Sequence, residues 1–120
     1  MRILFLGDVV GQTGCNAVKS NLQKIITKEN IDFTIVNGEN AADEGVGITQ
    51  NILDEFLSCG VDVVTSGNHI WDQKETNEFI KNQSRLLRPL NMDKNLPGQG
   101  FTVLNSRKGL RIGVLNLMGN

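Results

Sequence analysis

The sequence predicts an α/β fold, a layered sheet flanked by helices. Short apolar runs of the kind that form buried parallel strands alternate with segments whose apolar residues recur at helical spacing. Three of these runs end in polar or glycine-rich residues, as is typical at the carboxyl edge of an open α/β sheet. A chain of 120 residues can bury one core, and no repeat or linker divides it. We therefore expect a single domain over residues 1–120.

The first strand is expected at residues 3–6, because an unbroken apolar run is typical of a strand buried on both faces. A glycine-rich turn follows at residues 7–14. The next segment should be a helix, since Val18, Leu22 and Ile26 recur at helical spacing and Asn30 can end it.

The second strand is expected at residues 33–36 and the third at residues 61–66. Between them lies a small, glycine-bearing loop at residues 41–47, and then a helix that Thr49 can cap and Gly60 can end. A short helix through residues 79–80 should follow the third strand, with Asp72 as its cap.

The last third of the chain predicts strands and loops. Leu86 and Leu87 suggest a short strand that Pro89 stops, and residues 91–98 resemble a surface loop. Apolar runs at 101–104 and 110–117 flank a polar turn that ends in glycine, a pattern typical of a β-hairpin.

The charge balance gives no reason to expect nucleic acid or a membrane as partner. Twelve basic and thirteen acidic residues give a net charge of -1, and the basic residues are scattered. No apolar stretch is long enough to span a membrane, and the N-terminal run is too short for a signal peptide. Cys15 and Cys59 lack metal-ligand spacing and are interpreted as structural thiols. A cytoplasmic protein is expected.

The glycine-rich turn contains one acidic candidate. Asp8 follows the first strand, where its carboxylate can hold a metal or favour the dipole of the following helix. The turn reads G-x-x-x-G-x-x-G rather than G-x-G-x-x-G, which disfavours a dinucleotide, and no G-K-[ST] is present.

The second strand ends in Glu39 and Asn40, whose oxygens suit hard or borderline divalent metals. The same residues are also turn-rich in composition, so a simple turn is the alternative. Their place at a second strand end, beside Asp8, favours metal binding.

The third strand delivers Asn68 and His69, the single histidine of the chain. An asparagine can bind a metal, and an imidazole beside two metals can protonate a leaving oxygen. Asp72 can orient this ring, although the helix cap is the favoured interpretation, and Trp71 can line a pocket or simply pack.

Three motifs together resemble a known family. These are Gly7-Asp8-Val9-Val10-Gly11, Asn37-Gly38-Glu39-Asn40-Ala41 and Ser66-Gly67-Asn68-His69-Ile70-Trp71-Asp72. The sequence resembles the calcineurin-like metallophosphoesterases, and within them the YmdB-like bacterial branch, which is similar to 2',3'-cyclic-nucleotide phosphodiesterases. The resemblance implies a four-layer α/β/β/α fold.

The resemblance also implies roles for five residues. Asp8 would bind one metal, Glu39 would bridge two, and Asn40 and Asn68 would bind the second. His69 would donate a proton to the leaving alkoxide. The implied cofactors are two divalent or trivalent metal ions, iron or manganese, and the implied reaction is hydrolysis of a phosphodiester or nucleotide by metal-activated water.

The sequence departs from the family in length. Family members are about twice as long and take further histidine ligands from their second half, so residues 1–120 resemble the N-terminal part of the domain. We therefore expect weak or no activity from this chain alone, and a C-terminal half or a homo-oligomer as possible partner. A non-catalytic binding or regulatory domain is the alternative function, and a nucleotide-binding domain is a third.

Overall fold

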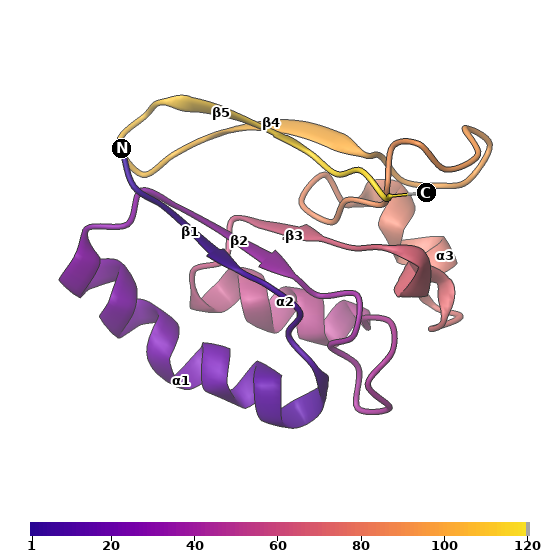
Figure 1. Ribbon diagram of the computed structural model, residues 1–120, viewed down its shortest axis with the longest axis horizontal. Helices are drawn as coiled ribbons and strands as arrows, with labels where there is room; N and C mark the ends of the chain where they lie inside the picture. Colours follow the sequence, from indigo (N-terminus) through magenta and orange to yellow (C-terminus); the bar gives the residue numbers. More distant parts are fainter. Residues whose placement is uncertain (120) are drawn as a thin grey trace.

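The computed structural model describes residues 1–119 and has three parallel strands at its centre (Figure 1). They are β1 (Ile3–Leu6), β2 (Phe33–Asn37) and β3 (Val63–Thr65), in the order β1-β2-β3. Helices α1 (Gly11–Glu29) and α2 (Gln50–Cys59) cover one face of this sheet (Figure 1). An antiparallel hairpin, β4 (Phe101–Asn105) and β5 (Arg111–Leu115), covers part of the other face. The α/β class is confirmed.

The helix ends follow the local sequence signals. The Thr49 side chain accepts a hydrogen bond from the backbone N–H of Ile52 at 3.3 Å, so it caps α2. Gly60 ends α2 with φ 115°, and Asn30 ends α1 with φ 52°. Both residues adopt the left-handed conformation in which glycine and asparagine are the least strained.

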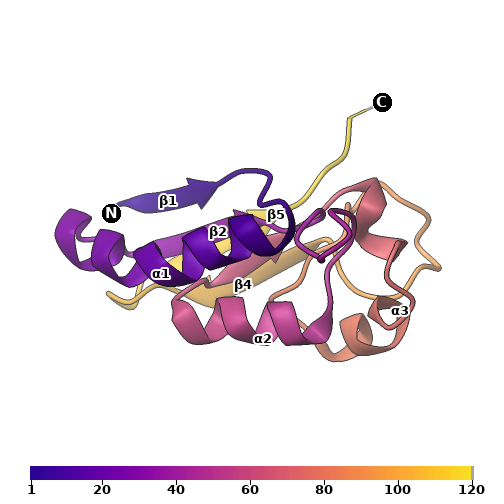
Figure 2. The ribbon, with the colours of Figure 1, turned by 90° about the horizontal axis from the view of Figure 1, so that it is seen from below.

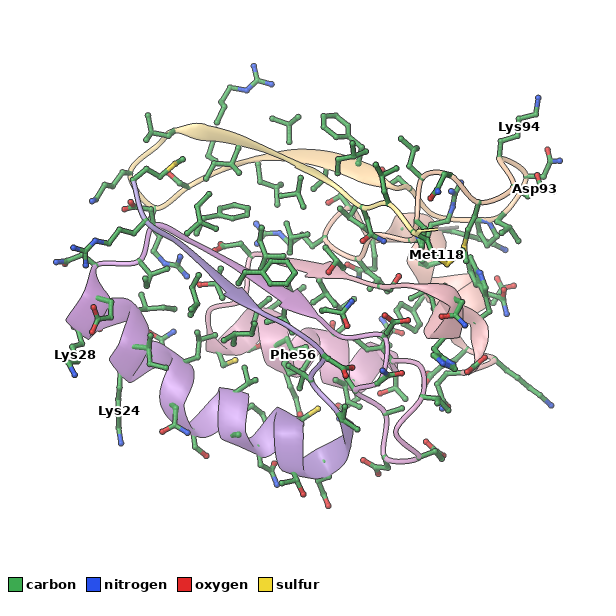
Figure 3. All side chains as sticks on the ribbon, viewed as in Figure 1. Lys24, Lys28, Phe56, Asp93, Lys94 and Met118 are labelled. Carbon is green, nitrogen blue, oxygen red and sulfur yellow. The ribbon has the colours of Figure 1, made fainter. Side chains whose placement is uncertain are left out.

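The central sheet separates two apolar clusters. On the helix side, Leu22, Leu53 and Phe56 are buried against β2 and β3, and Figure 3 shows Phe56 between α2 and the sheet. On the hairpin side the cluster contains Phe33, Val63, Leu87, Ile112 and Val114.

The expectation that the first strand is buried on both faces is wrong. Ile3 is 45% exposed and Phe5 is 58% exposed, although Leu4 and Leu6 pack against the helix-side cluster. The reason is that the hairpin packs over β2 and β3 and leaves β1 uncovered on that side (Figure 2).

The segment after β3 also differs from its prediction. It forms three short pieces, η1 (Asn68–Trp71), α3 (Thr76–Phe79) and η2 (Ile80–Asn82). Asp72 ends η1 and Glu75 precedes α3, so Asp72 does not cap the next helix.

The expected strand at Leu86 and Leu87 is reduced to single parallel bridges, to Val64 and to Gln99. These bridges link the edge of the central sheet to the segment that leads into β4. The strand order therefore continues from β3 through residues 86–87 to the hairpin, which folds back over the sheet (Figure 1).

A backbone hydrogen bond and an ion pair hold the turn of the hairpin next to Asp32, which directly precedes β2. The backbone N–H of Arg107 donates to Asp32 O at 3.1 Å, and Lys108 Nζ lies 3.0 Å from Asp32 Oδ1. The backbone N–H of Arg2 and the Lys108 ammonium both donate to the buried Asp32 carboxylate and lower its pKa. Within residues 1–119, no helix combines the length and the apolar character needed to cross a bilayer.

Candidate functional site

The carboxyl ends of the three parallel strands form one edge, and backbone hydrogen bonds join them. The N–H of Val9 donates to Asn37 O at 3.1 Å, and the N–H of Gly38 donates to Thr65 O at 3.0 Å. The N–H of Gly11 also donates to Asn40 O at 2.9 Å. The loops after β1, β2 and β3, which contain all five predicted site residues, are therefore held next to one another.

Asp8 and Asn40 meet directly. The Asn40 Nδ2 donates to Asp8 Oδ1 at 2.8 Å. Asp8 has φ 48°, a left-handed conformation that costs free energy in a residue other than glycine. The neighbouring Val9 N–H bond to the end of β2 helps to hold this turn.

The Oδ1 atom of Asn40 is buried and has no hydrogen-bond partner among the described residues. A buried oxygen without a donor is unfavourable, and native proteins rarely leave one unsatisfied. Its neighbour is an exposed carboxylate, that of Asp8. This pair of oxygens is suited to accept a cation.

Glu39 extends from the end of β2 towards the end of β3. Its carboxylate lies against Gly67, where an added Cβ would come within 2.7 Å of Glu39 Oε1. The only side-chain hydrogen bond to this carboxylate is a long one, 3.5 Å from Asn37 Nδ2, among residues 1–119. Gly67 therefore provides the space that the Glu39 carboxylate occupies after the end of β3.

His69 lies in η1 and is paired with Asp72. The His69 Nδ1 is 2.6 Å from Asp72 Oδ2, and both side chains are 40% exposed. A ring whose Nδ1–H donates to a carboxylate presents Nε2 as its free nitrogen. Asp72 therefore orients the ring. The sequence interpretation ranked this role below that of a helix cap. The i,i+3 spacing of His69 and Asp72 was the signal in the sequence that pointed to their contact.

The structure does not assemble a complete metal centre from acidic, histidine and cysteine side chains. Within residues 1–119, no group of three or more such residues is placed to hold a metal ion. Asn68 is the exposed first residue of η1, and its side-chain amide makes no hydrogen bond within residues 1–119. Trp71 packs against the helix-side core, which supports the packing interpretation.

A separate polar pocket of about 270 Å³ lies between α1 and α2. Asn16, Lys19 and Glu55 are among its lining residues, and none of the five predicted site residues lines it. The cluster at the strand ends therefore remains the candidate site.

Residues 4–120 match the YmdB-like protein family. The chain belongs to this family. The YmdB-like chain is 45% identical over 119 residues to the 2',3'-cyclic-nucleotide 2'-phosphodiesterase of Bacillus subtilis, covering 99% of this chain and 44% of that protein. It is 37% identical to a putative phosphatase/phosphodiesterase of Mycoplasma pneumoniae, covering 99% of this chain and 43% of that protein.

Two solved structures share this fold. A hypothetical protein from Thermus thermophilus superposes with a TM-score of 0.89 at 38% identity, over 100% of this YmdB-like chain and 46% of that one. A novel phosphatase from Mycoplasma pneumoniae gives 0.87 at 38% identity, over 98% and 43% of the two chains. The YmdB-like chain thus spans less than half the length of the relatives that it matches.

Proposed function

We propose that residues 1–120 form the N-terminal part of a metal-dependent phosphodiesterase, acting on phosphodiesters such as 2',3'-cyclic nucleotides. The names of the relatives and the membership in the YmdB-like family support a phosphoesterase. The observation that carries the proposal is the pairing of Asp8 with Asn40, whose Oδ1 is buried without a donor.

The residues present fit the implied metal ions. Asp8, Glu39, Asn40 and Asn68 offer carboxylate and amide oxygens on three adjacent strand ends, and we propose that they hold two ions, iron or manganese. When bound, such ions activate water and neutralise charge on a phosphodiester. The orphaned Asn40 oxygen is the local observation that supports this assignment.

His69 supplies the proton in this proposal. Its Nδ1 pairs with Asp72, which leaves Nε2 to donate a proton to the leaving oxygen of the substrate. Asp72 fixes the direction of the ring, and Nε2 can give up a proton when both ring nitrogens carry one. Asp72 acts through His69 and is therefore a positioning residue.

We propose that the remaining metal ligands come from the polypeptide that corresponds to the unmatched part of the relatives. Two carboxylates and two amides hold two metal ions weakly, so this chain alone should bind metal poorly and turn over slowly. The fourth layer of the implied α/β/β/α fold belongs to the same proposal. The outer face of the hairpin exposes Phe101, Val103 and Leu115, and this layer would cover them.

The test measures metal content and manganese-dependent hydrolysis of bis(p-nitrophenyl) phosphate. The chain is assayed alone and mixed with the separately produced unmatched part of the Bacillus subtilis relative. The expected result is chelator-sensitive turnover in the mixture that Asn40→Ala abolishes and Asn77→Ala, at an exposed site in α3, leaves intact. A stable mixture without metal and without turnover would overturn the proposal in favour of a non-catalytic binding domain.

A further inference from the structure

The loop after β2 folds back on itself through Gly47. The backbone N–H of Gly47 donates to Glu39 O, and the N–H of Ala42 donates to Gly47 O at 2.9 Å. Gly47 has φ 79°, a left-handed conformation that favours glycine. The loop that begins with Glu39 and Asn40 therefore closes at Gly47.

Gly47 is buried, and it lies against the segment that carries His69. A Cβ added at Gly47 would lie 2.7 Å from Gln73 Cγ and 3.4 Å from His69 O. The first of these distances is shorter than a carbon–carbon contact allows, so the backbone at Gly47 leaves no room for a side chain. The loop of Glu39 and the segment of His69 are thus packed directly against each other.

The Gln73 side chain joins the same two parts of the chain by hydrogen bonds. Its Nε2 donates to Val46 O at 3.0 Å and to Glu44 Oε2 at 3.2 Å. An amide nitrogen carries two hydrogens, so both find an acceptor in the loop after β2. Gln73 directly follows Asp72, whose carboxylate lies 2.6 Å from His69 Nδ1. One side chain therefore connects the His69–Asp72 pair to that loop.

We propose that Gln73 is a positioning residue, which holds His69 in place relative to the loop of Glu39 and Asn40. This role rests on the proposed function, in which His69 gives a proton to a substrate held at the metal ligands. Proton transfer needs the ring nitrogen within hydrogen-bonding reach of the leaving oxygen, and a displacement of about 1 Å can cost roughly 100-fold in rate. The contact with Asp72 directs the ring, but both residues belong to one segment. Gln73 fixes the place of that segment.

Thr76 anchors the following turn independently of Gln73. Its Oγ1 donates to Ile48 O at 2.9 Å, and the side chain is fully buried. The two bonds of Gln73 reach a partly buried carbonyl and an exposed carboxylate. Their loss should therefore leave α3 in place and the chain folded, so that a substitution at Gln73 tests position rather than folding.

Three variants separate the donor from the packing of the side chain. Gln73→Met keeps a stem of similar length against Gly47 but has no donor. Gln73→Lys keeps a donor for Val46 O and for the Glu44 carboxylate. Gln83→Met is the matched control, at a half-buried glutamine after η2 whose side chain makes no hydrogen bond within residues 1–119.

Hydrogen exchange on this chain alone tests the contact without an assay of hydrolysis. The reporters are the backbone amides of Gly47 in the loop and of Asp72 at the end of η1, each of which is hydrogen-bonded. Both should exchange about tenfold faster in Gln73→Met, and at the parent rate in Gln73→Lys and in the control. The amide of Val64 in β3 should exchange equally in every variant. Unchanged exchange of both reporters in Gln73→Met would overturn the proposal.

Turnover measures the consequence for His69, in the mixture with the unmatched part of the Bacillus subtilis relative. Gln73→Met should lower kcat for bis(p-nitrophenyl) phosphate about 10- to 100-fold with KM and manganese content unchanged, and Gln73→Lys should restore kcat. An unchanged kcat in Gln73→Met, or a loss that Gln73→Lys does not restore, would refute the positioning role. An inactive parent mixture would contradict the proposed function instead, and the exchange rates then decide whether Gln73 holds the two segments together.

Discussion

Gly67→Ala should separate the integrity of the fold from the integrity of the candidate site. The backbone at Gly67 has φ -144°, outside the left-handed region that favours glycine. The added methyl would lie 2.7 Å from Glu39 Oε1, well inside the 3.4 Å at which ordinary contact begins. The Glu39 carboxylate must therefore move away from the end of β3.

The energetic cost of that movement to the fold is small, because the atoms displaced are the end of a flexible side chain held by one long hydrogen bond. The free energy of unfolding should change by less than about 1 kcal/mol. Manganese affinity in the reconstituted two-part protein should fall about 10- to 100-fold, which is the usual effect of displacing a group around a metal.

Calorimetric titration with manganese and thermal unfolding measure the two quantities. Gly113→Ala is the matched control, because its methyl would meet Phe101 at an ordinary 3.4 Å. A folded Gly67→Ala protein with unchanged manganese affinity would show that Glu39 is not a metal ligand.

Three other substitutions test separate parts of the reasoning. His69→Ala should lower turnover about 100- to 10,000-fold in the mixture of this chain with the unmatched part of the relative. Metal content, measured by mass spectrometry, should stay nearly constant. Parallel loss of metal would make His69 a ligand. Asp72→Asn should lower kcat with little change in KM, because it removes the carboxylate that lies 2.6 Å from the ring and orients it; an unchanged kcat would leave Asp72 a structural role only. Asp32→Asn should make the free energy of unfolding less sensitive to acid. Because the pKa of Asp32 is lowered in the folded protein, its contribution to stability is complete above about pH 4 and is lost as the pH falls through that lowered pKa. The free energies of urea unfolding at pH 7 and at pH 3 should therefore differ less in the variant, and an equal difference would contradict this role.

The helices and strands with strong local signals were predictable from the sequence. The bounds of β1 agree, and the ends of α1 and α2 fall at Asn30 and Gly60 because these residues tolerate the left-handed conformation. The segment after β3 was not predictable in detail. Asp72 satisfies the pattern of a helix cap, but its carboxylate bonds to His69 instead, and α3 starts four residues later.

The location of the site was predictable from the chain order, because parallel neighbours bring their carboxyl ends to one edge. Its contacts were not. The sequence contains no signal that the Asn40 Nδ2 donates to Asp8 while the Asn40 Oδ1 is left buried, or that Gly67 makes room for Glu39. Such facts depend on side-chain directions in loops, which residue spacing does not determine.

The exposed face of β1 and the candidate site belong to the same sheet. An apolar run such as Ile3–Leu6 is typical of a strand buried on both faces, yet within residues 1–119 β1 is covered on the helix side alone. Asn116, directly after β5, bonds to Ser66 O at the end of β3, so the free edge of β5 extends to the same end of the sheet as the candidate site.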